Sequence, residues 1–508
     1  MSKKILYGLL FLMFLLVAVR PIYTNDAFIY LSIAKTILQA NGLPLIDPFI
    51  YSITDYKWNI NHEWLGFLIF YALHAMAGWP LLYAFQLLIN LLTVFTPAIF
   101  STQLTKNYWP VVLVLSVALW AAKTRFATRT SIFTDLFIVS TLAIALLYYY
   151  KRSKLYYALP GIFLIWTNTH PGFYIGLFCI GLPFLFSVKS LLDKGHRKYL
   201  AFSLLSLLAC MLNPHGLGGF LFPLRTMSES EWGIYRMVNP EWIPTYHAYY
   251  INNYGAWGFV VTFLIAGLIL LFSKSRDKYK LLAVYGLFLY LGLNAFRHIS
   301  WTSLCAAILA VSSLHSNDRA FTKTRERSII FVVTAINVLL AAIVYSRDSN
   351  KVHWALNGFS PMVSNNDFPI NGTRFIIENN LDGNLFNDHK FGGYLTYNLP
   401  PGRKIFCHGF IDDQKFLLND YLKIVANKGE FDRITKKYDI EVFLLSSNLI
   451  PRGKRVNPKN VPYIISMLFT GSEWSLVFYD PISLVIVKNI SKYQDVVSKY
   501  GLAPKVNR

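Results

Sequence analysis

A series of long apolar runs, separated by short basic stretches, is the feature that most constrains how this chain can fold. One helix needs about 20 consecutive, mostly apolar residues to cross a bilayer. Hydrophobic residues make up 54% of the 508 residues, more apolar surface than a soluble protein of this length needs. The sequence therefore predicts an all-α polytopic membrane domain. We interpret eleven runs as membrane-spanning helices: 5–20, 81–104, 109–122, 131–150, 155–169, 172–188, 199–213, 255–273, 281–296, 299–314 and 328–345.

The distribution of lysine and arginine between the loops predicts the orientation of these helices. We take the N-terminus as cytoplasmic and segment 64–78 as a juxtamembrane helix lying on the outer face. The short cytoplasmic loops, such as 151–154 and 274–280, are then dense in cations, and the longer outer loops hold fewer. This asymmetry is the one that the positive-inside rule describes. The first outer loop, residues 21–80, and the chain after about residue 347 are therefore expected on the extracytoplasmic side.

The same loops account for the net charge of +21, so we expect membrane lipids and no nucleic acid among the partners. The first apolar run ends in AVRPIY without a small-x-small cleavage site. That ending predicts an uncleaved first helix rather than a signal peptide. The expected location is a bacterial inner (plasma) membrane.

The last third of the chain has a different sequence pattern from the apolar runs before it. Short β-rich runs such as EVFLLSS and SLVIVK alternate with polar, helix-like stretches at 414–428 and 430–438. This alternation is typical of a small α/β domain. We therefore predict a membrane domain at 1–346 and an extracytoplasmic α/β domain at 347–508.

Polar and charged residues gather in the tight turns that this topology places at the outer membrane boundary. Such residues are costly between hydrophobic helices and are usually functional. Two carboxylates, Asp26 and Glu63, are the candidate catalytic groups. The candidate substrate-binding residues are three arginines and three histidines: His62, Arg125, Arg129, His170, Arg297 and His298.

These residue types suit a substrate with a lipid tail in the membrane and a phosphate at its surface. Asp26 and Glu63 can accept a proton from a hydroxyl group, or hold a divalent cation such as Mg²⁺ or Mn²⁺. Arginine clamps a phosphate through parallel hydrogen bonds, and histidine can donate to the same group. A polyprenyl-phosphate sugar is such a substrate, and its phosphate would be the leaving group.

Simpler roles stay open for several residues. Asp26 is also a favoured N-cap for a surface helix. Arg125 and Arg129 also suit the binding of lipid headgroups, and Asp47, which precedes a proline, is more typical of a turn. Asp135 is the ionised residue within the predicted spans, one turn from the outer end, where it can pair with a nearby arginine.

Several segments resemble the glycosyltransferase C (GT-C) superfamily, in an uncharacterised bacterial branch. They are TNDAFIYLSIAKTI, GLPLIDPFIYS, HEWLGFLIFYAL, RFATRTSIFTDLF, WTNTHPGFY and LNPHG, with a looser match in NLFNDHKFGGYLTYNLPPGRKIFCHG. The resemblance implies a long outer loop with an acidic residue near its start, which acts as catalytic base or metal ligand. Here that residue is Asp26. The family often has a paired acidic motif, whereas this chain has Asn25-Asp26.

The resemblance implies a membrane glycosyltransferase that moves a sugar from a polyprenyl-phosphate-linked donor to a glycan, lipid or protein acceptor on the extracytoplasmic face. A surface-polysaccharide polymerase or ligase is an alternative, although the soluble part of such proteins is usually a loop between spans. A transporter would place ionisable residues near the membrane midplane, and the predicted spans are almost free of them. A non-catalytic scaffold for envelope-glycan assembly also stays open.

Overall fold

The computed structural model describes residues 3–57, 60–105, 109–187, 196–228, 240–315, 362–411, 413–449, 463–470 and 473–502, with short stretches between 328 and 343. The chain forms two compact units. The first comprises Met1–Pro21 and His62–Met362, and the second comprises Ile22–Asn61 and Val363–Arg508.

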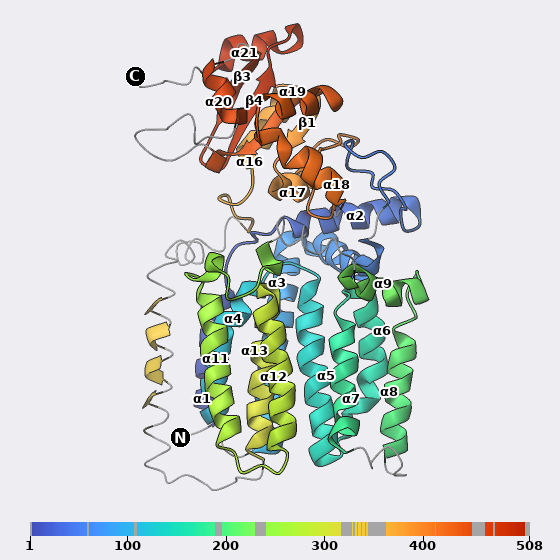
Figure 1. The fold of residues 1–508 in the computed structure, drawn as a ribbon, viewed down its shortest axis with the longest axis vertical. Helices are drawn as coiled ribbons and strands as arrows, with labels where there is room; N and C mark the ends of the chain where they lie inside the picture. Colours follow the sequence, from blue (N-terminus) through green and yellow to red (C-terminus); the bar gives the residue numbers. More distant parts are fainter. Residues whose placement is uncertain are drawn as a thin grey trace. The chain divides into compact units, whose positions relative to one another are not determined.

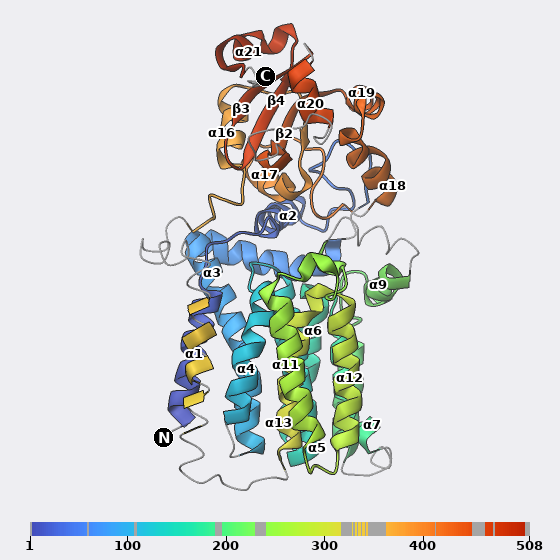
Figure 2. The same cartoon turned by 60° about the vertical axis from the view of Figure 1, so that its left-hand side comes forward.

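The first unit is a bundle in which most helices run side by side (Figures 1 and 2). Each predicted span from 5–20 to 299–314 is helical over most of its length, and the predicted span 328–345 is described only in short helical pieces. The helices are α1 (Lys3–Ala18), α3 (Trp64–Leu104), α4 (Trp109–Ala122), α5 (Ser131–Lys151), α6 (Leu159–Thr169), α7 (Phe173–Phe186), α8 (Arg197–Ala209), α9 (Leu217–Ser228), α11 (Tyr254–Leu271), α12 (Lys278–Asn294) and α13 (Ile299–Ser313). Short 3₁₀ turns join them: η1 (Ile60–Glu63), η2 (Lys123–Arg125), η3 (Lys154–Ala158), η6 (Pro240–Trp242), η7 (Ala248–Tyr250) and η8 (Phe296–His298).

The centre of the bundle is α13, in which every residue is buried. It packs against α3, α4, α5, α11 and α12. Its sequence, ISWTSLCAAILAVSS, combines apolar side chains with small hydroxyl residues. Hydroxyls such as those of Thr302 and Ser312 donate to backbone carbonyls one turn earlier, which satisfies them inside an apolar core. A helix without a polar face is the type that becomes fully buried.

Helix α3 is kinked at Ala77 and Gly78. Gly78 has a φ of 67°, in the left-handed region that glycine adopts without strain, and Pro80 follows closely. Before the kink, α3 runs across the end of the bundle, and after it the helix runs along its neighbours (Figure 2). Segment 64–78 is therefore separate from the span that begins near residue 81, as the interpretation of this segment as a juxtamembrane helix requires.

Among the described residues, three helices are long and apolar enough to cross a membrane: Trp64–Leu104, Ser131–Lys151 and Tyr254–Leu271. Tyr7–Ala18 and Phe173–Phe186 are shorter apolar helices. The prediction of a mostly helical membrane protein is confirmed, but the count of eleven spans is not. The reason is length, because helices such as α6, with 11 residues, are far shorter than the roughly 20 residues that a bilayer needs.

The second unit contains the small sheet expected near the C-terminus. Its strand order is β1-β2-β4-β3, with β1 and β2 parallel and the other pairs antiparallel. The strands are β1 (Asn384–Asn387), β2 (Ile440–Ser446), β3 (Trp474–Tyr479) and β4 (Ser483–Lys488). The helices around it are α16 (Ile370–Glu378), α17 (Gly392–Asn398), α18 (Gln414–Phe416), the π-helical turn η10 (Leu417–Tyr421), α19 (Lys428–Lys437), α20 (Tyr463–Thr470) and α21 (Gln494–Tyr500).

Residues 22–61 belong to this second unit, although they follow the first bundle helix in sequence. Helix α2 (Asp26–Ala40) buries Phe28, whose ring meets Phe368 and Tyr394 edge-on at centroid distances of 4.9 and 5.1 Å. Farther on, Ile50 forms a parallel bridge with Ile405. The sequence analysis groups residues 21–80 with the membrane domain. In the structure, the apolar side chains of α2 bury against the C-terminal segment instead.

A buried pair, Asp47 and His408, also joins residues 22–61 to the C-terminal segment. Asp47 Oδ2 lies 2.7 Å from His408 Nε2, and neither side chain is exposed. Asp47 Oδ1 accepts a hydrogen bond from the Phe49 N–H, so this residue also forms the turn expected of it. His408 Nδ1 accepts from the Phe410 N–H, which leaves the ring proton on Nε2, facing Asp47. Burial acts to raise the pKa of Asp47, but His408 and the backbone donors outweigh it and lower that pKa.

Candidate active site

Glu63 is a buried carboxylate at one end of the helical bundle, directly before α3. Its Oε2 accepts a hydrogen bond of 2.7 Å from Thr130 Oγ1. Its Oε1 lies 3.6 Å from His62 Nε2 and 3.7 Å from His170 Nε2. His62 in turn stacks on Phe222 of α9, with ring centroids 4.6 Å apart. A single carboxylate thus gathers side chains from four segments that are far apart in sequence.

A chain of hydrogen bonds fixes the orientation of His170. Trp166 Nε1 donates to Thr134 Oγ1 over 2.7 Å, and Thr134 Oγ1 lies 2.8 Å from His170 Nδ1. Because the threonine oxygen accepts from the indole, its own hydroxyl proton is available for His170 Nδ1. The proton of the neutral imidazole then lies on Nε2, which faces Glu63.

The pKa values of Glu63 and His170 shift in the directions that this arrangement predicts. Burial acts to raise the pKa of Glu63, but the imidazoles of His62 and His170 and the Thr130 hydroxyl outweigh it and lower the pKa to about 2. Burial lowers the pKa of His170 to about 3, and the charges of Arg297 and Arg125 act in the same direction. At neutral pH the site therefore holds an ionised Glu63 beside a neutral His170.

This state predicts a pH dependence of stability. Between its ordinary value of 6.5 and the folded value of about 3, His170 binds fewer protons in the folded than in the unfolded chain. Its contribution to the free energy of unfolding therefore decreases as the pH falls from 6.5 towards 3. At neutral pH, we expect His170→Gln to melt at a lower temperature than the native chain. Below about pH 6.5, the two melting temperatures should approach each other. Melting curves of both proteins that stay parallel from about pH 8 to about pH 4 would contradict this assignment.

Gly66 makes room for Thr130 beside Glu63. A Cβ atom at residue 66 would stand 2.7 Å from Thr130 Cγ2 and 3.2 Å from the carbonyl oxygen of Thr169. Gly66→Ala is therefore expected to displace Thr130 from Glu63 and to cost about 1–3 kcal/mol of stability, the usual cost of overpacking. Adding Thr130→Ser removes the clashing methyl group and keeps the hydroxyl, so the double variant should recover much of the loss. Thermal unfolding of the three proteins measures this, and no recovery in the double variant would contradict the packing argument.

A second cluster forms around Glu241, a residue that the sequence analysis does not single out. Arg125 Nη1 lies 2.9 Å from Glu241 Oε2, and Arg129 Nη1 contacts Glu241 Oε1. Burial acts to raise the pKa of Glu241, but Arg129 and Arg125 outweigh it and hold that pKa well below its usual range. Arg125 has only 6% of its side chain exposed, and in the described part of the chain its Nε has no hydrogen-bond partner. One carboxylate thus balances two guanidinium groups, and the cluster keeps a positive excess.

Arg297 and His298 lie beside this cluster, on η8. The guanidinium carbon of Arg297 lies 4.0 Å from the ring centroid of Trp242, a cation–π contact. His298 Nδ1 donates to the Leu291 carbonyl over 3.1 Å. Burial lowers the pKa of His298 to about 3, and the charge of Arg297 adds to the shift. The neutral ring then carries its proton at Nδ1 and an acceptor at Nε2, and a role of His298 in binding phosphate stays a prediction.

Asp135 lies in α5, within electrostatic range of Arg125 and Arg297. Its Oδ2 accepts a hydrogen bond of 3.0 Å from Ser300 Oγ, at the start of α13. The sequence analysis expects this carboxylate to pair with an arginine. The structure gives it a hydroxyl donor and places the arginines near it, which adds a third negative group to this end of the bundle.

Asp26 lies in the second unit, as the half-buried first residue of α2. The N-cap position of this helix is occupied by Asn25, and Asp26 is its first helical residue rather than its cap. Asn25 makes no side-chain capping bond; its Oδ1 accepts from the Tyr394 N–H at 3.3 Å. A Cβ at Gly393 would stand 2.3 Å from the Asn25 carbonyl oxygen, so glycine permits this close approach. The convergence of Asp26 with the arginines of the first unit stays a prediction.

The residues around Glu63 do not match a divalent cation. Mg²⁺ and Mn²⁺ favour several oxygen ligands, whereas the carboxylate faces a threonine hydroxyl and two imidazoles. Within the described ranges, no group of three or more His, Cys, Asp or Glu side chains is arranged to hold a metal ion. We derive no reaction step through a metal at Glu63, and a role of Asp26 as metal ligand stays a prediction.

The candidate residues of the first unit thus form two neighbouring clusters at one end of the bundle. The carboxylate cluster contains His62, Glu63, Thr130, Thr134 and His170. The arginine cluster contains Arg125, Arg129, Glu241, Trp242 and Arg297. The sequence analysis misses the two threonines and the Glu241-Trp242 pair.

The fold is similar to that of known glycosyltransferases. The oligosaccharyltransferase of Archaeoglobus fulgidus, crystallised with a tethered acceptor peptide that contains the NVT sequon, has a TM-score of 0.54 and 10% identity. The alignment covers 88% of this chain and 69% of that one. Arabinofuranosyltransferase AftD from Mycobacteria has a TM-score of 0.48 and 13% identity, with 97% of this chain and 42% of that one covered.

This chain thus spans less than half the length of AftD. No protein-family model matches the sequence, and no curated protein matches it. The likeness to the archaeal oligosaccharyltransferase agrees, at the level of the fold alone, with the resemblance to the GT-C superfamily drawn from the sequence motifs.

Proposed function

We propose that this chain, which carries the GT-C fold, is a membrane glycosyltransferase whose donor is a polyprenyl-phosphate-linked sugar. The acceptor is a glycan, lipid or protein on the extracytoplasmic face, and the N-terminus is cytoplasmic in an inner membrane crossed by about eleven helices. The observation that carries the proposal is the arginine cluster. It holds excess positive charge at the end of a bundle of apolar helices.

A lipid phosphate fits this cluster by charge and by geometry. Two guanidinium groups share one carboxylate, and the buried Nε of Arg125 is a donor without a partner in the described part of the chain. Arg297, fixed on the face of Trp242, lies close enough to influence the charge of Glu241. Charge-assisted hydrogen bonds from arginine to phosphate are among the stronger polar interactions in proteins. The lipid tail would lie along the apolar helices.

The reaction then follows from the charges. The acceptor oxygen attacks the anomeric carbon, the bond from that carbon to the phosphate oxygen breaks, and the phosphate leaves with the bonding electrons. The arginine cluster stabilises the negative charge that develops on the phosphate. The proton of the acceptor hydroxyl goes to Asp26, the acidic residue of the first outer loop.

Glu63 is poorly suited to take that proton. Its pKa of about 2 makes it a weak base, whereas an efficient general base has a pKa near the working pH. We assign to Glu63 a positioning role: a fixed anion that holds the imidazoles of His62 and His170 in place. Of the two carboxylates expected to be catalytic, the proposal keeps Asp26 as the proton acceptor.

The activity can be tested with the full chain in nanodiscs and synthetic polyprenyl-phosphate sugars labelled in the sugar. An envelope fraction of the source cells supplies acceptors, and the readout is release of polyprenyl phosphate with transfer of the label. We expect transfer from at least one hexose or pentose donor. Transfer from nucleotide sugars alone, or from no donor across the panel, would overturn the proposal.

Glu241→Gln separates phosphate binding from structural pairing. Without the carboxylate, the buried charge of Arg125 loses its ion-pair partner, so the free variant should melt at a lower temperature. Polyprenyl phosphate should then bind about tenfold more tightly than to the native chain, because it no longer competes with Glu241. It should also restore the melting temperature. The matched control is Glu378→Gln, an exposed carboxylate on α16. A variant that the lipid does not rescue would contradict the phosphate assignment.

A further inference from the structure

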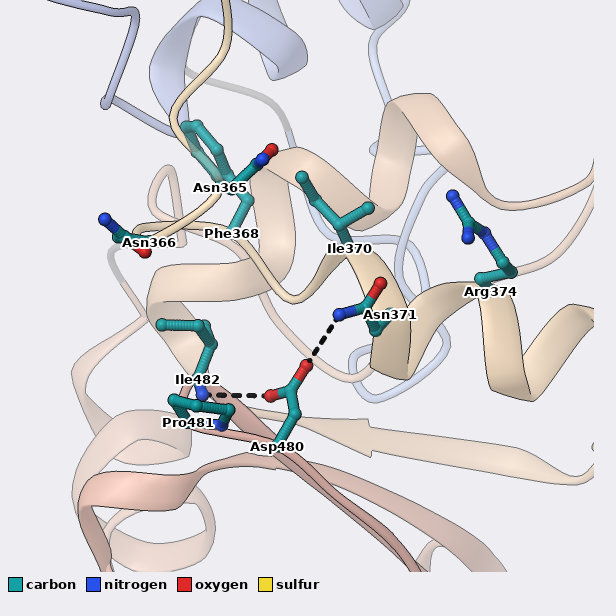
Figure 3. A pocket seen from close by; sticks show the side chains of 9 residues that line it. All are labelled: Asn365, Asn366, Phe368, Ile370, Asn371, Arg374, Asp480, Pro481 and Ile482. Atoms are coloured by element: carbon teal, nitrogen blue, oxygen red, sulfur yellow. Dashed lines mark hydrogen bonds between the residues drawn. The ribbon is translucent and has the colours of Figure 1, made fainter. Parts of the chain in front are cut away.

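A hollow of about 350 Å³ lies in the second unit, between the start of α16 and the turn that joins β3 to β4 (Figure 3). Its volume is at the lower end of the roughly 300–1,000 Å³ typical of small-molecule sites. Most of its lining is polar or charged. The lining includes Asn365, Asn366, Phe368, Asn371, Arg374 and Asp480.

Asp480 is held rigidly at the floor of the hollow. Its Oδ1 accepts hydrogen bonds from the N–H groups of Ile482 and Ser483, at 2.9 and 2.7 Å, and from Ser483 Oγ at 3.2 Å. Its Oδ2 accepts from Asn371 Nδ2 at 3.2 Å, which joins the β3–β4 turn to α16 (Figure 3). The carboxylate and the amide are therefore fixed before any ligand arrives, which reduces the entropic cost of binding.

The side chains across from Asp480 combine donors and acceptors. Asn365 and Asn366 each carry an amide with two N–H donors and one acceptor oxygen, and Arg374 adds further donors. Phe368 is almost fully buried behind this lining, where its ring stacks on Tyr394 at an interplanar angle of 18°. The hollow thus presents hydrogen-bond donors and acceptors around a fixed carboxylate.

We propose that this hollow binds one neutral sugar unit of a glycan. This deepens the proposed function, on which it rests, because it assigns the acceptor to the glycans. Each sugar hydroxyl both donates and accepts hydrogen bonds, and amides paired with a carboxylate offer both partners side by side.

Charge decides against an anionic ligand. The Asp480 carboxylate in the lining repels phosphate or a uronate. The single positive charge of Arg374 only cancels the charge of Asp480, so the lining has no positive excess to hold an anion. A neutral saccharide is not repelled by the carboxylate. This distinguishes the hollow from the arginine cluster of the first unit, where positive charge is in excess.

Binding can be measured on the full chain in nanodiscs by saturation-transfer NMR, with methyl glycosides of neutral hexoses and the matching hexuronates as probes. We expect at least one neutral glycoside to bind and its uronate to bind more weakly. Asn371→Leu removes one amide from the floor and should raise the Kd at least about tenfold. Asn366→Trp fills the hollow from an exposed loop residue, without touching the Asp480 turn, and should abolish binding.

Two controls make the outcome decisive. Asn379→Leu makes the same chemical change at the far end of α16, outside the hollow, and should bind like the native chain. Asp26→Asn, which tests the transferase activity, should leave glycoside binding unchanged. Binding that survives both Asn371→Leu and Asn366→Trp, or no binding by any neutral glycoside, would overturn this inference whether or not the transferase activity is found. Binding without transferase activity would sustain this site and count against the proposed function alone.

Discussion

Replacing Asp26 with asparagine is expected to lower the rate of sugar transfer by roughly 10²–10⁴-fold, the usual contribution of a general base. The change keeps the shape of the side chain and removes its ability to take a proton. Helix α2 should persist, because asparagine has nearly the same shape as aspartate and the helix is held by the buried packing of Phe28. The measurement is the initial rate of polyprenyl-phosphate release at saturating donor.

The matched control for this variant is Asp55→Asn. Asp55 lies in the same first loop, is exposed, and has a φ of 54°, a conformation that asparagine tolerates well. It should transfer sugar at the native rate. An Asp26→Asn protein that folds normally and retains the native rate would remove the proton acceptor from the proposed reaction and favour the non-catalytic scaffold.

The largest expected effect on stability comes from the Asp47–His408 pair. Asp47→Ala leaves a fully buried imidazole N–H without its acceptor and also removes the bond to the Phe49 N–H. Breaking a buried polar pair on one side costs about 3–5 kcal/mol. The pair links residues 22–61 to residues 363–508. We therefore expect peptides that cover β2 to exchange their amide hydrogens faster in Asp47→Ala than in the native chain. Peptides from the bundle helices provide the internal reference.

A double-mutant cycle separates the pair from general packing. Asp47→Leu combined with His408→Leu removes both polar groups, so no buried donor or acceptor is left unpaired. The double variant should be more stable than the sum of the two single variants predicts. Additive losses would show that the two side chains contribute independently. The Asp47–His408 pair would then not be the contact that holds the two segments together.

The helices of the bundle could be predicted because each is a continuous apolar run that can be recognised from its own residues. An apolar run such as 131–150 needs no partner to be recognised, and it becomes α5 (Ser131–Lys151). The span count is not confirmed where the runs are short, since composition alone does not reveal whether a helix such as α6 continues across a membrane. The sheet near the C-terminus could also be expected, because β2 and β4 are continuous apolar runs.

The partners within the site could not be predicted, because they depend on contacts between distant segments. Glu241 is one of four glutamates followed by tryptophan, at positions 63, 231, 241 and 473, so the dipeptide does not identify it. Asp47 and His408 are 361 positions apart, and neither carries a local sign of the other. The tautomer of His170 depends on the hydroxyl of Thr134, which lies 36 positions away in sequence on another helix.

The division of the second unit between the two ends of the chain has a consequence for synthesis. Residues 22–61 leave the ribosome first, and their partners beyond residue 363 follow about 300 residues later, which takes roughly 15–60 s at 5–20 residues per second. During that interval the apolar side chains of α2, Phe28 among them, have no C-terminal partners to cover them. A nascent chain of this kind depends on a temporary cover, from a chaperone or from the membrane surface, until translation ends.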